Sequence, residues 1–349
     1  INAKNSREWF NYSHNYFSTM KKILLILFLA TLFFCKKEIE PATYSPTLVE
    51  FETPVHFPFL NLPKDNPLTV EGINLGRKLY YDSLLHPNKT NSCASCHLQD
   101  EGFSSINVNS LPHVNMAWST FFLWNGEIEG GLEEAMEFEV HDFFKTDFDQ
   151  LKQDPHYLSL YEDAFGTTDI NLETTSKALA QFLRTVVSAN SDYDEFFKGE
   201  KPLTASQYRG YLIYNSEKGD CFHCHGYPLL ADNQFHNTGL DSVFTSNNMV
   251  RYEITKNTSD VGKFKTPTLR NVEFTRPYMH DGRFMTLEEV VEFYNSGVKL
   301  SPTLDPIMTK SGKENGLGLS EQDKKDLVNF LKSFTDNEFL TSEAYSNPH

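Results

Sequence analysis

Apolar residues recur at helical spacing along much of the chain. Three stretches carry the i, i+3, i+4 pattern of an amphipathic helix, at residues 69–82, 131–144 and 172–189. The third has the most continuous apolar face, made by Ala178, Leu179, Phe182, Leu183 and Val186. No stretch sustains the two-residue alternation of a half-buried strand. The pattern therefore predicts an all-α fold.

Three more helices are predicted from their start signals. Thr204 is followed by Gln207, and Thr286 by Glu289, each pair three positions apart as in a capping box. Ser320 is expected to cap the last helix, whose inward face would be Leu327, Phe330, Leu331 and Phe334. Residues 98–125 show little period and are expected to form a long loop.

The chain divides at its polar and proline-rich stretches. Residues 41–67 are rich in proline and lack a period, so they are expected to form a tether. The polar stretch 191–202 is the best candidate boundary. Since 349 residues leave room for two cores, we expect one domain at 68–195 and a second at 196–340.

The first forty residues carry the pattern of an export signal. Two lysines after Met20 precede an apolar run, 23–34, that is too short to span a bilayer. The polar residues before Met20 read as upstream sequence. The run ends at Cys35, which resembles the lipidated cysteine of a bacterial lipoprotein, although bulky residues precede it. A plain secretory peptide and an uncleaved anchor are the alternatives. Each predicts a location in the periplasm or cell envelope, with the membrane reached only through the N-terminus.

Four of the five cysteines fall in two C-x-x-C-H motifs, the pattern that attaches a c-type haem. Cys93 and Cys96 precede His97, and the second motif supplies the set Cys221, Cys224 and His225. Two C-x-x-C pairs can also bind zinc, but these pairs are much further apart than those of a zinc ribbon. We therefore predict two covalent haems, with His97 and His225 as iron ligands. A net charge of −16 argues against nucleic acid as a partner.

The residue opposite each histidine decides the function, because an open site permits peroxide binding and a filled site favours electron transfer. The candidates are His113, Met116, His141, Met279, His280 and Tyr294. The residues alone do not choose among them. A weak repeat, G-x-x-apolar-Tyr at 76–80 and at 210–214, precedes both motifs and indicates two related domains.

Longer motifs link the chain to a known family. The sequences K-T-P-T-L-R-N-V at 265–272, P-Y-M-H-D-G-R at 277–283 and L-G-R-K-L-Y-Y-D at 75–82 surround the two haem motifs. Together they resemble the bacterial dihaem cytochrome c peroxidase and MauG family. The resemblance implies two c-type cytochrome-like haem domains with long haem-wrapping loops. It also implies a peroxidatic haem in the N-terminal domain and an electron-transfer haem in the C-terminal domain.

The resemblance assigns roles to further residues. Tyr294 falls at the position of the sixth ligand of the electron-transfer haem, with Met279 and Met285 as fallbacks; alternatively it belongs to the apolar stripe of its helix. Trp124 lies in a segment similar to the one that carries the electron-relaying tryptophan, or is a packing aromatic. A calcium site would map onto the side chain of Asn109 and the backbone carbonyls of Thr275 and Pro277.

The peroxide pocket departs from the family pattern. Ala135 stands where the family has Gln, Glu139 where it has Pro, and Lys145 where it has Glu. Cleavage of peroxide needs a base that takes one proton and returns it to the leaving oxygen. Glu139 is the candidate for this base, or it could ligate the iron instead. His141 could replace it as the base. Both residues could instead belong to a solvated helix face.

These expectations combine into a function. The chain is predicted to be an exported dihaem peroxidase-like oxidoreductase that reduces hydrogen peroxide with electrons from a small cytochrome or cupredoxin. One alternative is MauG-like oxidation of a side chain in a partner protein. The other is a dihaem electron carrier without turnover.

Overall fold

The computed structural model describes residues 44–349, apart from 247, 311, 314 and 315. The predicted export signal and Cys35 lie outside the described residues. Within the described part, no helix is both long and apolar enough to cross a membrane. Residues 46–349 form one unit with two separate hydrophobic cores.

Within the described residues, the first core is built by six helices and a pair of strands, one helix coming from the C-terminal end of the chain. Gly76 of α2 permits the close approach of α6, since a Cβ there would lie 1.9 Å from the carbonyl oxygen of Ala178. This explains the glycine of the first G-x-x-apolar-Tyr repeat. The regular elements of this lobe are α2 (Val70–Tyr81), β1 (Phe121–Phe122), β2 (Ile128–Glu129), α3 (Leu132–Phe138), α4 (Phe148–Lys152), α5 (Pro155–Phe165) and α6 (Leu172–Thr185).

The second core repeats this construction. Gly210 of α8 faces α11, and a Cβ there would lie 2.1 Å from the carbonyl oxygen of Asp326. The regular elements of this lobe are α7 (Asp192–Lys198), α8 (Ala205–Tyr214), β3 (Phe235–His236), α9 (Arg251–Thr255), β4 (Phe264–Lys265), α10 (Leu287–Glu292) and α11 (Glu321–Lys332). β1 pairs with β2 and β3 with β4, both antiparallel. Most of the remaining short turns are 3-10 helices, among them Cys93–Ser95 and Cys221–His223 in the haem motifs, and two are π-helical.

The predicted helices and caps are present. Thr204, Thr286 and Ser320 each accept a hydrogen bond from the backbone of the first turn that follows. The fold is therefore helix-rich as predicted, with two short strand pairs in addition. Two details differ from the sequence pattern. Helix α6 ends at Thr185 rather than at 189, and α3 passes into a π-helical turn, Glu139–Phe143.

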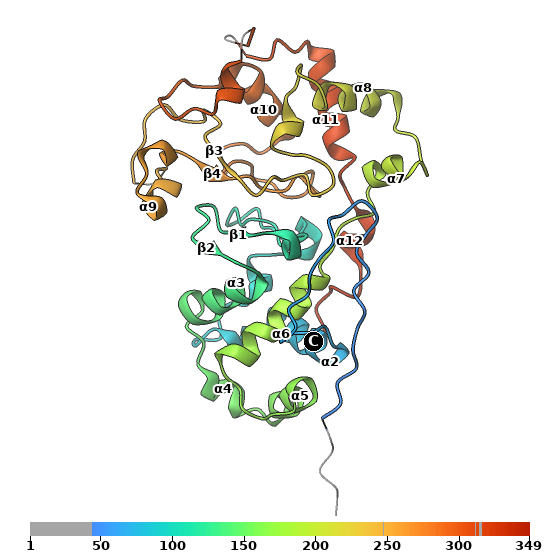
Figure 1. The fold of residues 1–349 in the computed structure, drawn as a ribbon, viewed down its shortest axis with the longest axis vertical. Helices are drawn as coiled ribbons and strands as arrows, with labels where there is room; N and C mark the ends of the chain where they lie inside the picture. Colours follow the sequence, from blue (N-terminus) through green and yellow to red (C-terminus); the bar gives the residue numbers. More distant parts are fainter. Residues whose placement is uncertain (1–43, 247, 311, 314–315) are drawn as a thin grey trace, which may run out of the picture. The chain divides into compact units, whose positions relative to one another are not determined.

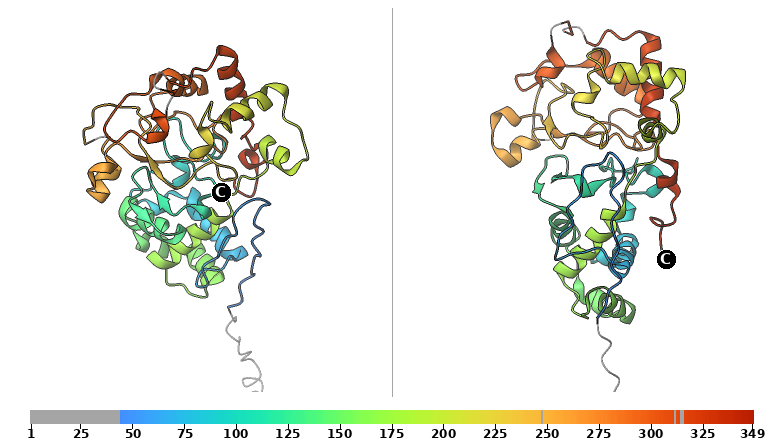
Figure 2. Two further views of the ribbon diagram at one scale, coloured as in Figure 1. Left: turned by 45° about the horizontal axis from the view of Figure 1, so that its top comes forward. Right: turned by 45° about the vertical axis from the view of Figure 1, so that its right-hand side comes forward.

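The chain passes from the first core to the second between Val186 and Tyr193, and its last residues return to the first core. Tyr193 belongs to the second core, whereas Phe339 of α12 (Asn337–Thr341) packs with the first. The backbone carbonyl of Ser346 accepts a hydrogen bond from Arg77. Both views in Figure 2 show the C-terminal segment running down to the first lobe.

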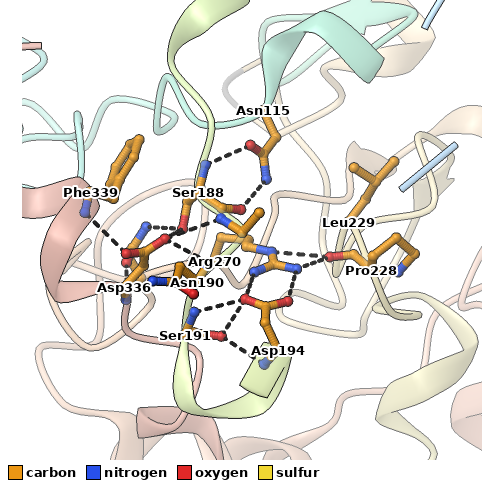
Figure 3. Close-up of polar contacts among 12 residues, drawn as sticks. Asn115, Ser188, Asn190, Ser191, Asp194, Pro228, Leu229, Arg270, Asp336 and Phe339 are labelled. Atoms are coloured by element: carbon orange, nitrogen blue, oxygen red, sulfur yellow. Dashed lines mark hydrogen bonds and ion pairs between the residues drawn. The ribbon is translucent and has the colours of Figure 1, made fainter. Parts of the chain in front are cut away.

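A buried polar network fastens the linker between α6 and α7 (Figure 3). The carboxylate of Asp336 accepts hydrogen bonds from the hydroxyl of Ser188 and from the backbone N–H groups of Ala189 and Asn190. Asn115 of the first lobe bonds the backbone of Ser188 in both directions. Because these groups are paired away from water, the network fixes the linker that joins the two cores.

An ion pair lies next to this network. The guanidinium of Arg270 donates two hydrogen bonds to the carboxylate of Asp194, and both side chains are almost fully buried. Burial alone would raise the pKa of Asp194, but Arg270 and the hydroxyl of Ser191 hold it below its ordinary value. The pair anchors the start of α7 to the segment 265–272.

Candidate functional site

The first C-x-x-C-H motif presents a neutral imidazole to a cavity. The Nδ1–H group of His97 donates a hydrogen bond to the carbonyl of Phe103, 3.0 Å away, so Nε2 is the nitrogen that could bind a metal. Burial lowers the pKa of His97 to about 4, so the ring carries no proton on Nε2 at neutral pH. A neutral imidazole oriented by a backbone carbonyl is the usual form of a metal ligand.

The cavity beside His97 has a volume of about 920 Å³. Cys93 and Cys96 lie in its wall together with aromatic and apolar side chains, including Met136, Trp118, Phe121, Phe122, Phe138 and Phe144. An apolar cavity of this size beside two thiols and a free imidazole nitrogen fits a covalently attached haem.

The second motif has the same construction. The Nδ1–H group of His225 donates to the carbonyl of Leu230 at 3.0 Å, and the hydroxyl of Tyr214 donates to the carbonyl of His225 at 2.6 Å. Burial lowers the pKa of His225 as well. Its cavity measures about 690 Å³ and includes both cysteines of the motif, so the residues of the second lobe also fit a haem.

Tyr294 lies in the wall of the second cavity, as its predicted role requires. It comes from the π-helical turn Phe293–Gly297 that follows α10. Burial, and then the thiols of Cys224 and Cys221, raise the pKa of its hydroxyl. The phenol shares the lining of this cavity with Cys221 and Cys224 of the second haem motif.

The helices that carry Tyr294 and Glu139 are repeats of each other. The sequence L-E-E-A-M-E-F-E at 132–139 matches L-E-E-V-V-E-F-Y at 287–294, and both segments end in a π-helical turn. Such turns occur frequently at functional sites. Glu139 is thus the counterpart of Tyr294, and it lies in the wall of the first cavity. Burial raises its pKa to about 7.

Trp124 and Lys265 lie between the cavities and belong to the walls of both. The backbone N–H of Lys265 donates to the carbonyl of Trp124 at 2.9 Å. Lys265 is 9% exposed, and burial lowers its pKa to about 8. Among the residues that the structure describes, no carboxylate forms an ion pair with it.

Of four other candidates, two lie outside the cavity walls and two line a cavity. The side chain of His141 is 68% exposed, contacts Asp142 and lies outside the walls of both cavities. Met285 is 45% exposed and also lies outside them, whereas Met279 lines the second cavity. His113 lines the first cavity and stacks on the ring of His97, the histidine of the first haem motif.

The three predicted calcium ligands lie in one wall of the second cavity. The Nδ2 group of Asn109 donates to the carbonyls of Met279 and His280, which leaves its Oδ1 atom available. Across residues 44–349, with the four gaps noted above, the structure gives no hydrogen-bond donor to the carbonyls of Thr275 and Pro277. Calcium prefers six to eight oxygen ligands, so these three would need water to complete the site.

Sequence reasoning missed a half-buried charge beside the second haem motif. His236 contacts carboxylate oxygens on both sides, from Asp232 at 2.8 Å and from Asp305 at 2.5 Å. The hydrogen bond to Asp232 is the largest of several contributions that raise its pKa to about 11, so the imidazole is charged. Asp305 is distant in sequence, and no motif pointed to this contact.

Known proteins resemble the chain over most of its length. The sequence profile of the di-haem cytochrome c peroxidase family matches residues 70–202. The cytochrome-c peroxidase IdrP1 of Denitromonas iodatirespirans is 30% identical over 332 residues, which cover 80% of this chain and 85% of the relative. The methylamine utilization protein MauG of Methylorubrum extorquens is 32% identical over 292 residues, which cover 78% of this chain and 80% of the relative.

A solved structure agrees with these relatives. A MauG-like protein associated with microbial copper homeostasis superimposes with a TM-score of 0.79 at 30% identity, covering 86% of this chain and 99% of that one. Together with the two haem motifs and their cavities, these similarities show that the chain belongs to the di-haem cytochrome c peroxidase and MauG family of oxidoreductases.

Proposed function

We propose that the protein reduces hydrogen peroxide in the first cavity with electrons that enter at the second. The observation that carries this proposal is the position of Glu139. It is the repeat counterpart of Tyr294, and it is a carboxyl group in the wall of a cavity whose lining is mostly apolar. When bound at each motif, a haem supplies an iron that binds small ligands and exchanges single electrons.

Glu139 performs the proton transfer in this proposal. Its carboxylate takes a proton from one oxygen of peroxide and returns it to the other, which leaves as water. The complete reaction consumes hydrogen peroxide, two electrons and two protons and gives two molecules of water. A pKa of about 7 suits both steps, because the group is then easily ionised and easily protonated near neutral pH. His141 is not proposed for this role because its side chain lies in solvent.

Trp124 provides the path between the haems. Trp124 lies in the walls of both cavities, so it would stand between the two haems when both are bound and would carry electrons from one to the other. The buried ammonium of Lys265 carries the charge complementary to haem propionates. The electron donor is a small cytochrome or cupredoxin that docks near the second haem.

Tyr294 is proposed as the sixth ligand of the second haem. An anionic phenolate stabilises ferric iron more than a thioether does, and so lowers the reduction potential. This ligand favours a second candidate function, MauG-like oxidation of a side chain in a partner protein, over the electron carrier. Calcium at Asn109, Thr275 and Pro277 would fix Asn109, which lines both cavities, to the wall of the second. We further propose export to the cell envelope with a lipid anchor at Cys35.

Steady-state turnover separates the functions. The purified dihaem protein is given hydrogen peroxide and reduced cytochrome c, and oxidation of the cytochrome is followed by absorbance. Turnover that saturates with both substrates supports the peroxidase. Reaction with peroxide without cytochrome turnover supports the MauG-like function, and no reaction of either haem with peroxide supports the carrier.

A further inference from the structure

An additional imidazole lies against the iron ligand of the first lobe. The rings of His97 and His113 are parallel to within 14°, with centroids 3.4 Å apart. His113 also lines the first cavity. A stack this close restricts rotation of the His97 ring and places a polarisable, polar ring in contact with it.

The two lobes allow this position to be compared within one chain. In the first lobe, the carbonyl of Phe103 accepts hydrogen bonds from the His97 ring and from the backbone N–H of His113. In the second, the carbonyl of Leu230 accepts from the His225 ring and from the backbone N–H of Leu269. His113 and Leu269 are therefore equivalent positions.

Further landmarks support the same alignment. Phe103 and Leu230 both have positive φ, at 57° and 54°. Asn115 and Asn271, each two residues after the compared position, also have positive φ, at 54° and 58°. The substitution of an imidazole for an aliphatic side chain is thus a real difference between two otherwise similar haem-binding loops.

The imidazole also changes a hydrogen bond behind the ligand. Tyr214 donates to the carbonyl of His225 at 2.6 Å. The equivalent Tyr80 lies 3.5 Å from the carbonyl of His97 but 3.2 Å from Nδ1 of His113. The tyrosine hydroxyl of the first lobe has therefore turned from the ligand backbone toward His113.

We propose that His113 is a positioning residue of the first haem, which fixes the orientation of the His97 ring and lowers the reduction potential of this haem relative to an aliphatic neighbour. The orientation follows from the stack, since rotation of His97 would bring the two rings into collision. The potential follows from polarity, because a polar ring in contact with the ligand stabilises the extra positive charge of ferric iron.

The chain supplies the variant that tests this. His113→Leu copies the residue of the second lobe, and His113→Phe keeps a flat ring but removes the nitrogen that faces Tyr80. For both we would measure the ferric electron paramagnetic resonance spectrum and the potentials of both haems in the same protein. The second haem is the internal control.

We expect His113→Leu to change the anisotropy of the first-haem signal and to favour its ferrous form by about tenfold, or about 59 mV for one electron. His113→Phe should restore the anisotropy but not the potential. The proposal is overturned if His113→Leu leaves the first-haem spectrum and potential unchanged. It is equally overturned if both haems shift together, since this would indicate a general structural effect; in that case His113→Phe should shift both as well.

Discussion

The substitution Glu139→Gln removes the proposed proton-transfer group while preserving its shape. A positioned acid–base group contributes about 10²- to 10⁴-fold to rate, so kcat/KM for peroxide should fall by a factor in this range. The two haem motifs are untouched by this change, so the haem content and the spectrum of the second haem should be retained.

The pH profile makes the test specific to this carboxyl. Burial raises the pKa of Glu139 from 4.5 to about 7, a shift that corresponds to roughly 3 kcal/mol against its ionisation in the cavity. Because the base is the ionised form, peroxide turnover should rise as the pH increases through about 7. A carboxyl with an ordinary pKa of 4.5 would already be ionised well below pH 7 and would give no such rise.

The assay is peroxide-dependent oxidation of reduced cytochrome c between pH 5.5 and 8.5. The matched control is Glu137→Gln, because Glu137 is exposed and lies two residues earlier on the same helix. The reasoning fails if Glu139→Gln keeps the wild-type rate and pH profile, or if Glu137→Gln loses as much activity.

Folding stability should show the opposite pH trend. Since folding raises the pKa of Glu139, the folded state binds this proton more tightly than the unfolded chain does. The free energy of unfolding therefore decreases as the pH rises from about 4.5 to about 7, and Glu139→Gln should remove this part of the decrease. Urea unfolding at pH 5 and pH 8 measures it, and an identical pH dependence in the variant and the wild type would contradict the burial of this carboxyl.

Three further substitutions test separate parts of the structure. Tyr294→Phe should change the ferric spectrum of the second haem, because the phenolate ligand is lost; an unchanged spectrum would remove the assignment. Trp124→Phe should slow electron transfer from the second haem to the first while preserving both spectra, whereas Trp118→Phe, in the wall of the first cavity alone, should leave the rate unchanged; equal rates in all three proteins would exclude the relay. Asp194→Asn leaves a buried guanidinium unpaired and should cost about 3–5 kcal/mol in urea unfolding. The control is the exposed ion pair between Asp192 and Lys201, where Asp192→Asn should cost less than about 1 kcal/mol. Similar losses of stability in the two variants would contradict the burial argument.

Local sequence signals predicted the parts of the fold that local physics determines. The caps at Thr204, Thr286 and Ser320 depend on hydrogen bonds over three residues, so a pattern of four positions is enough to find them. The glycine–tyrosine repeat was also visible in the sequence. Its physical basis needed the structure, because Gly76 and Gly210 are explained by helices that are distant in sequence.

The site could be predicted only in part because its remaining geometry is not local. With an ideal α-helix assumed for this segment, the sequence did not predict which of Glu139 and His141 faces the cavity. The π-helical turn begins at Glu139 and adds a residue to the turn, so the positions after it leave the face that Glu139 occupies. The stacking of His113 on His97 and the contact of His236 with Asp305 join residues from different loops, and no spacing in the chain encodes them.

Electron paramagnetic resonance of the ferric dihaem protein, before and after hydrogen peroxide is added, examines both haems at once. If peroxide is reduced at the first haem, the untreated protein should contain a high-spin ferric signal from the haem of His97 and a low-spin signal from the six-coordinate haem of His225. The high-spin signal should disappear on addition of peroxide. Two low-spin signals that peroxide leaves unchanged would show that both irons are closed, and would contradict peroxide reduction by this protein.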